Sequence, residues 1–179
     1  MTLAYVTRAG QEQQIAWIAG SVHRIVLDKD ATDGRLTAFR STMRAGVASP
    51  VHVHEREDET VFLLSGTGVF WSGDQRWELS SGDTAFLPRG LPHSYVFTSE
   101  EAELLTICNP SGMEEFFRAA GWDLSQPKPQ DWAVDIKSLA KIGAGLGQTV
   151  LGPPLAPDAQ MPPEYLVPAS RPERGTSLY

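Results

Sequence analysis

The chain of 179 residues contains four histidines, and three of them lie in short patterns with a glutamate and several glycines. His52 and His54 are separated by one residue, Glu59 follows after a short polar turn, and His93 begins a later predicted strand. In a strand, alternate side chains face the same way, so His52 and His54 would point together. Glu59 can return to that face from the next strand. Three imidazoles and one carboxylate that converge in this way form a site for a divalent transition metal.

The predicted cofactor is one divalent ion, and this donor set does not choose among iron, manganese, nickel, cobalt, copper and zinc. Four protein ligands leave one or two positions open on a five- or six-coordinate ion. These positions can take a substrate oxyanion, such as an enolate, together with water or dioxygen. Because neutral imidazoles bind metal through a lone pair, neutral or mildly alkaline pH favours occupancy.

Short extended segments dominate the first 108 residues and would position these ligands. They are rich in Val, Phe, Leu, Thr and Trp, and Gly, Asp, Ser and Pro separate them. The predicted strands are Ser21–Val26, Arg35–Met43, Thr60–Leu64, Gly68–Trp71, Arg76–Leu79, Thr84–Leu87, Ser94–Phe97 and Glu103–Cys108. About eight strands without intervening helices favour an antiparallel sandwich or barrel over a βαβ sheet.

Helical patterns replace the strands after residue 109. Ser111 and Glu114 match a capping box, and a second helix is expected from Asp131 to a glycine-rich stretch at 143–147. Seven of the 13 prolines follow Gly152, which predicts an extended tail. We expect one domain overall, made of an N-terminal segment (1–20), a barrel (21–108) and a C-terminal part (109–179) whose helices and tail pack on the barrel.

The two histidine patterns resemble the two motifs of the cupin superfamily. They read Gly46-x5-His52-x-His54-x4-Glu59-x6-Gly66 and Gly82-x5-Pro88-x-Gly90-x2-His93. Every metal-ligand position matches, and the departure is Phe97, where the family often has Asn. The resemblance covers roughly residues 35–108. It implies an all-β fold, the cupin double-stranded β-helix or jelly-roll barrel, with the metal inside and a short C-terminal helical appendage.

A weaker resemblance extends to the segment Pro110–Phe117 and the proline-rich end. A single barrel followed by these features is similar to small bacterial cupins related to quercetin 2,3-dioxygenase. In quercetinase-like cupins the residue equivalent to Glu59 ligates the metal and takes a proton from the flavonol. The resemblance therefore implies both roles, ligand and catalytic base, for Glu59.

Strand parity also predicts which residues line the cavity. Tyr95 and Phe97 follow the third motif histidine at alternate positions, and Val61 and Leu63 share the parity of the glutamate. They would form an apolar cavity suited to an aromatic or enolisable substrate. The fourth histidine, His23, stands alone in a predicted strand and is expected to be an ordinary packed or exposed residue.

Three classes of function fit these residues. The first is a metal-dependent dioxygenase acting on an enolisable or hydroxylated aromatic small molecule, as quercetinase-like cupins do. The second is a non-redox isomerase, cyclase or lyase that uses the metal as a Lewis acid. The third is a metal-binding cupin with a binding or regulatory role. The presence of all four predicted ligands weighs against the third class.

Composition excludes several other classes. A net charge of −7 argues against a general nucleic-acid binder, and no apolar run approaches the roughly 20 residues that span a bilayer. Met1–Gly20 lacks the charged-then-apolar order of a secretion signal, and the single cysteine, Cys108, cannot form an intramolecular disulfide. We expect a cytoplasmic protein that acts on a small molecule. A homodimer is also expected, through edge strands or exchange of the N-terminal segment.

Overall fold

Strand β10 (Glu101–Asn109) shows how the chain builds the wall of its barrel. Its residues alternate between exposed or half-buried and fully buried positions. Ala102, Leu104, Thr106 and Cys108 face inward and are at most 4% exposed. This period of two is the pattern of a strand with one face on a hydrophobic core.

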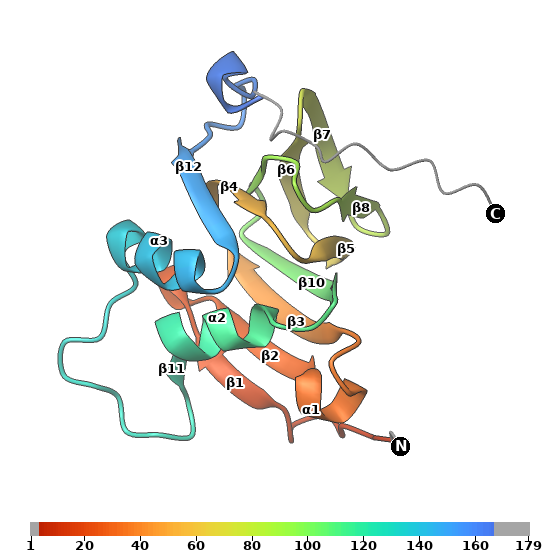
Figure 1. Ribbon diagram of the computed structural model, residues 1–179, viewed down its shortest axis with the longest axis vertical. Helices are drawn as coiled ribbons and strands as arrows, with labels where there is room; N and C mark the ends of the chain where they lie inside the picture. The colour runs from red at the N-terminus through yellow and green to blue at the C-terminus, as the bar shows by residue number, and fades with distance from the viewer. Residues whose placement is uncertain (1–3, 167–179) are drawn as a thin grey trace, which may run out of the picture.

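The computed structural model describes residues 4–166, which fold into two antiparallel sheets (Figure 1). In spatial order, the seven-stranded sheet holds β11 (Trp122–Asp123), β1 (Gln13–Ala16), β2 (Val22–Leu27), β3 (Thr37–Arg44), β10, β5 (Asp58–Ser65) and β8 (Thr84–Leu87). The five-stranded sheet holds β12 (Gln148–Pro154), β4 (Pro50–His54), β9 (His93–Phe97), β6 (Thr67–Ser72) and β7 (Gln75–Ser80). The expected all-β double-stranded β-helix is confirmed.

A core of buried side chains from both sheets fills the barrel. It contains Met43, Val47, Val61, Leu63, Phe70, Ala85, Leu87, Phe97, Ala102 and Leu104. The turn from β5 to β6 needs glycine, because Gly66 has a φ of 86° and an added Cβ would lie 2.5 Å from the carbonyl oxygen of Glu101. The last glycine of the first motif thus brings β6 back beside the core.

Within residues 4–166, three helices complete the fold: α1 (Lys29–Thr32), α2 (Met113–Ala120) and α3 (Ile136–Gly145). Short 3₁₀ turns lie at Ile18–Gly20 and Pro163–Tyr165. Helices α2 and α3 pack together at one end of the sheets (Figure 1) and share a second core cluster with the strands. That cluster contains Ile15, Trp17, Ile25, Phe39, Cys108, Met113, Phe117 and Leu139. Among the described residues, none of the helices has the length and apolar character needed to cross a membrane.

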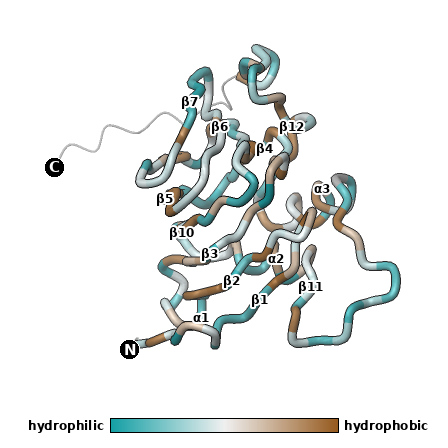
Figure 2. Tube along the Cα trace, turned by 180° about the vertical axis from the view of Figure 1, so that it is seen from behind, coloured by the Kyte–Doolittle hydropathy of each residue, from teal (hydrophilic) through white to brown (hydrophobic). Residues whose placement is uncertain are grey.

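Two details of the helices differ from the sequence prediction. The helix expected from Asp131 begins at Ile136, because the side chain of Asp135 accepts a hydrogen bond from the backbone N–H of Ser138 at 3.0 Å and caps it there. The polar segment before it is an exposed loop, seen as the long hydrophilic stretch between β11 and α3 in Figure 2. At the start of α2, Gly112 occupies the cap position, and the Glu114 carboxylate accepts its N–H at 3.0 Å.

The sheets also extend beyond the segment 21–108 that was expected to form the barrel. Strand β1 pairs with β2 of the same chain, and Ile15 of β1 is 1% exposed in the second core cluster. Strand β12 pairs with β4, which places Gln148 opposite His54 and Val150 opposite His52. Segments from both ends of the described chain therefore contribute strands to the sheets and border the cavity described below.

Candidate metal centre

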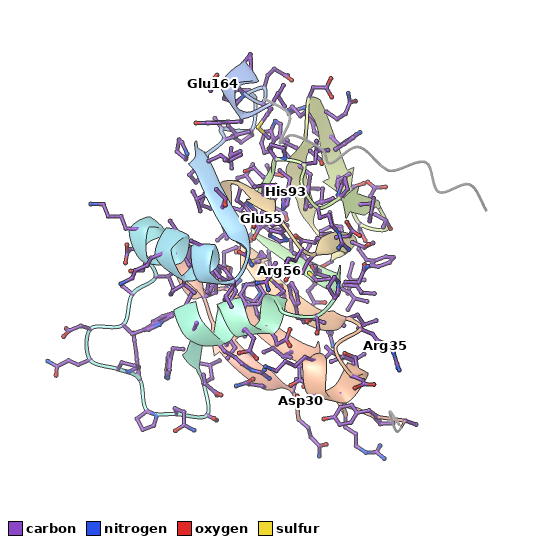
Figure 3. All side chains as sticks on the ribbon, in the orientation of Figure 1. Asp30, Arg35, Glu55, Arg56, His93 and Glu164 are labelled. Carbon is purple, nitrogen blue, oxygen red and sulfur yellow. The ribbon has the colours of Figure 1, made fainter. Side chains whose placement is uncertain are left out.

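Three histidines from two neighbouring strands meet inside the barrel. His52 and His54 lie on β4, His93 begins β9, and His52 and His93 are paired directly across the sheet. One ligand nitrogen from each ring lies within 4.8 Å of the other two. His93 is 1% exposed, whereas Glu55 and Arg56 on the loop that follows β4 are exposed; Figure 3 labels these three residues.

Backbone carbonyls fix the tautomers of two of these rings. Nδ1 of His52 lies 2.8 Å from the carbonyl oxygen of Pro50, and Nδ1 of His93 lies 3.1 Å from that of Leu91. A carbonyl oxygen only accepts, so each Nδ1 carries the proton and donates it. The lone pair of each ring is then on Nε2, the form in which an imidazole binds a metal.

The chemistry of the trio fits a divalent cation. Both ring nitrogens of His54, and Nε2 of His93, are buried without a hydrogen-bond partner among the described residues. A buried polar group without a hydrogen bond lowers the free energy of unfolding by about 1–3 kcal/mol. Three such nitrogens side by side need an explanation. Burial lowers the pKa of all three rings, that of His93 to about 3, and His52 and His93 lower that of His54 further. The rings are therefore neutral at neutral pH, and a bound cation would satisfy their free lone pairs.

Glu59 reaches the trio from β5. One carboxylate oxygen, Oε2, lies 3.8 Å from Nε2 of His93, and the residue is 7% exposed. Burial raises the pKa of Glu59 to about 7, while that of His93 falls to about 3, so without metal the contact is not an ion pair. A divalent cation between them would favour the ionised carboxylate. The structure thus places Glu59 beside His93, whereas the group whose ligand atoms all lie within 4.8 Å of one another contains the three histidines.

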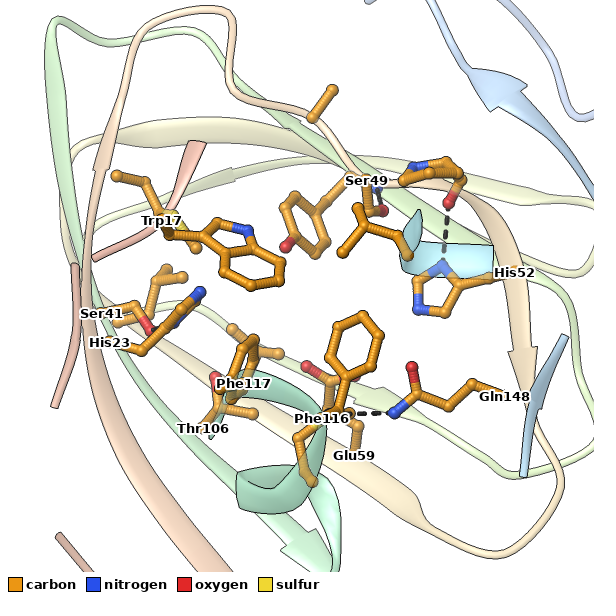
Figure 4. A pocket seen from close by; sticks show the side chains of 18 of the residues that line it. Trp17, His23, Ser41, Ser49, His52, Glu59, Thr106, Phe116, Phe117 and Gln148 are labelled. Carbon is orange, nitrogen blue, oxygen red and sulfur yellow. Dashed lines mark hydrogen bonds between the residues drawn. The ribbon is translucent and has the colours of Figure 1, made fainter. Parts of the chain in front are cut away.

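The centre opens into a largely apolar cavity (Figure 4). Of the predicted lining residues, Val61, Tyr95 and Phe97 border this cavity. Leu63 has the same strand parity and is 1% exposed, but it packs in the barrel core and does not line the cavity. Phe97 stands at the motif position where cupins often have Asn. It therefore contributes a buried aromatic ring to the cavity wall.

Several lining residues come from outside the motifs. They include Trp17, His23, Phe116, Phe117, Leu139 and Gln148. The side-chain amide of Gln148 donates to the sulfur of Met113 at 3.2 Å, which ties β12 to α2 at the cavity wall. The sequence predicted only that the C-terminal helices, which include Phe116 and Phe117, pack on the barrel. Their place in the cavity wall depends on where α2 docks, for which the sequence carries no local signal.

The sequence and the fold both have known relatives. Residues 39–108 match the family model of the cupin domain. Quercetin 2,3-dioxygenase from Bacillus subtilis (strain 168) is 30% identical over 117 residues, which are 65% of this chain and 34% of that protein. The chain spans only 21–50% of the length of the curated relatives it matches.

Solved structures share the fold at low sequence identity. KdgF from Halomonas sp. superposes with a TM-score of 0.57 at 18% identity and covers 63% of this chain and 99% of its own. The polyketide cyclase RemF from Streptomyces resistomycificus gives 0.52 at 17% identity, covering 61% of this chain and 81% of its own. At these identities the likeness extends to the architecture alone.

Proposed function

Because residues 39–108 form a cupin domain that resembles quercetinase-like proteins, we propose that this protein is a metal-dependent dioxygenase acting on an enolisable or hydroxylated aromatic small molecule. The observation that carries the proposal is the convergence of three neutral imidazoles beside Glu59 at the wall of an apolar cavity. The Bacillus relative named quercetin 2,3-dioxygenase supports the reaction type.

In this proposal, His52, His54, His93 and Glu59 hold one divalent ion, which is iron, manganese, nickel, cobalt, copper or zinc. When bound, the ion would stabilise a substrate oxyanion as a Lewis acid and allow dioxygen to react there. The hydrogen bonds from His52 and His93 to backbone carbonyls keep two lone pairs directed for binding.

Residues of the chain accept the proton of the substrate and bury its ring. Oε2 of Glu59 is the acceptor for the proton of the substrate hydroxyl, because this carboxylate reaches the trio and also lines the cavity. Val61, Tyr95 and Phe97 bury the ring of the substrate and exclude water from it. An aromatic compound with an acidic hydroxyl beside a carbonyl fits a site that combines a metal, a proton acceptor and an apolar wall.

Oxygen uptake tests the proposal directly. Protein reconstituted separately with each candidate metal is mixed with quercetin in an oxygen-electrode cell. We expect stoichiometric oxygen consumption with at least one metal and none with the His93→Ala variant. Conversion of the flavonol under strict anaerobiosis would contradict a dioxygenase.

The non-redox alternative rests on the same ligands, since three imidazoles and one carboxylate also support a Lewis-acid isomerase, cyclase or lyase. Turnover at an equal rate with and without oxygen, and with redox-inactive zinc, would favour it. A binding or regulatory role would instead be favoured by a purified protein that holds no metal and converts no substrate.

We further propose that the protein acts in the cytoplasm as a homodimer. Edge strand β8 supports a dimer, because Phe86 on this strand is 58% exposed. Light scattering of the purified protein measures the assembly, and Phe86→Lys would shift a dimer paired along this edge to monomer.

A further inference from the structure

The wall of the cavity made by the seven-stranded sheet carries a polar group that the metal centre does not use. His23 lies on β2 and Ser41 lies opposite it on β3, in the sheet that does not carry the metal-binding histidines. Both residues line the cavity and are 1% exposed. In Figure 4 they lie across the open space from His52.

The ring of His23 is held in one orientation. It stacks on Phe117 with centroids 3.9 Å apart and meets Trp17 and Phe39 edge-on at 5.3 and 5.7 Å. Its Nδ1 lies 2.7 Å from the hydroxyl oxygen of Ser41. Three aromatic contacts and one hydrogen bond hold the ring in this orientation.

The other ring nitrogen is unsatisfied. Nε2 of His23 is buried and has no hydrogen-bond partner among the described residues. A buried polar atom in this state costs free energy that a ligand group in the cavity would recover. The hydrogen bond with Ser41 sets the ring either as a donor or as an acceptor at Nε2. A phenolic hydroxyl satisfies both possibilities, because it donates and accepts.

We propose that His23 binds a hydroxyl group of the substrate at the end of the molecule away from the metal. The substrate class is then an aromatic compound with a metal-binding oxygen at one end and a phenolic hydroxyl at the other, separated by a ring that packs against Phe116 and Phe117. This inference rests on the proposed function for the metal end only. His23 and Ser41 would select among substrates by hydrogen bonding, which discriminates more strongly than apolar contact.

Phenol and toluene are matched probes, since they differ by a hydroxyl and a methyl group on the same ring. Zinc-loaded protein is titrated with each by calorimetry, and ¹⁵N spectra of histidine-labelled protein follow Nε2 of His23. We expect wild type to bind phenol at least fivefold more tightly than toluene, with a shift of the His23 Nε2 resonance by phenol alone. In His23→Phe, which keeps an aromatic ring on Phe117, phenol and toluene should bind equally and zinc content should be unchanged.

Equal binding of the two probes to wild type, no binding of either, or phenol binding without a change at Nε2 would each overturn the inference. The spectra of wild type decide the matter even if His23→Phe fails to fold. None of these results touches the metal chemistry, which is judged by elemental analysis and oxygen uptake. The two proposals can therefore fail separately.

Discussion

His52 and His93 face each other across β4 and β9, and the same kind of hydrogen bond to a backbone carbonyl orients both rings. Their ring centroids are 4.3 Å apart, and each ring donates from Nδ1 to the carbonyl oxygen of the residue two positions earlier. Both Nε2 atoms are thus left as lone-pair donors. Two strands with the same local geometry thus carry two candidate metal ligands in the protonation state that metal binding requires.

Removal of either ring should empty the metal site. In His52→Ala or His93→Ala, we expect bound metal to fall below about one tenth of the wild-type content, because removing only the hydrogen-bond partner of a ligand typically weakens metal binding by about 10–100-fold and removing the ligand itself should weaken it more. Elemental analysis after gel filtration measures it, and circular dichroism should show an intact barrel. His23→Phe is the matched control and should keep its metal. Equal metal in mutant and wild type would show that the ligand set is wrong.

Glu59→Gln separates metal binding from proton transfer. The amide can still ligate weakly but cannot accept a proton, so some metal should remain while kcat with a flavonol falls about 100-fold or more. Steady-state kinetics on samples matched for metal content give the value. Unchanged turnover would restrict Glu59 to ligation at most.

The motif residues could be predicted from the sequence because their spacing follows a local rule. Alternation within a strand brings His52 and His54 to one face, and turns at Gly66 and Gly90 return the chain to the same region. The role of His23 could not be predicted in this way. It depends on how β2 pairs with β3 and on where α2 docks, and these are contacts between segments far apart in the chain.

The difference between local rules and contacts of distant segments also explains which details of the fold were predicted correctly. Leu63 alternates in phase with Val61, yet only Val61 borders the cavity, because parity gives the face of a strand but not the position of a cavity along it. Helix α3 begins at Ile136 because Asp135 captures the N–H of Ser138, whereas Asp131 has the same residue type in an exposed loop. Asp131 and Asp135 could both cap a helix by the same hydrogen bond, and the packing of the segment determines which of them does so.

Acid should destabilise the protein in part through His23. Burial lowers the pKa of His23 in the folded state to about 3 from 6.5, so the unfolded chain takes up the proton first as pH falls. Stability is therefore lost below pH 6.5 and continues to fall toward pH 3, by about 2 kcal/mol at pH 5 for this residue. Urea unfolding at pH 7 and 5 should show a decrease that is about 2 kcal/mol smaller in His23→Phe than in wild type. An identical decrease in both proteins would contradict the assignment.

Glu114 should hold α2 in place. Its carboxylate is fully buried and accepts hydrogen bonds from the backbone N–H groups of Lys29 and Gly112, at 2.9 and 3.0 Å, and from the hydroxyl of Thr37. Glu114→Ala leaves these donors unsatisfied and should cost about 3 kcal/mol in the free energy of unfolding. Urea denaturation measures the loss.

The neighbouring Glu115 provides the control for that experiment. It is about a third exposed and makes surface ion pairs with Lys29 and Arg118 at 3.0 and 3.3 Å. Such pairs contribute about 0–1 kcal/mol, so Glu115→Ala should have a small effect. If the two variants lost equal stability, the buried carboxylate would not have the anchoring role assigned to it.

The central claim is that three imidazoles and one carboxylate bind a single ion inside the barrel. X-ray absorption spectroscopy of protein reconstituted with one equivalent of zinc tests it most directly. We predict a first shell of nitrogen and oxygen at about 2.0–2.2 Å, with the outer-shell scattering of three imidazole rings. A shell of oxygen alone, or one that includes sulfur or fewer than two imidazoles, would contradict the account.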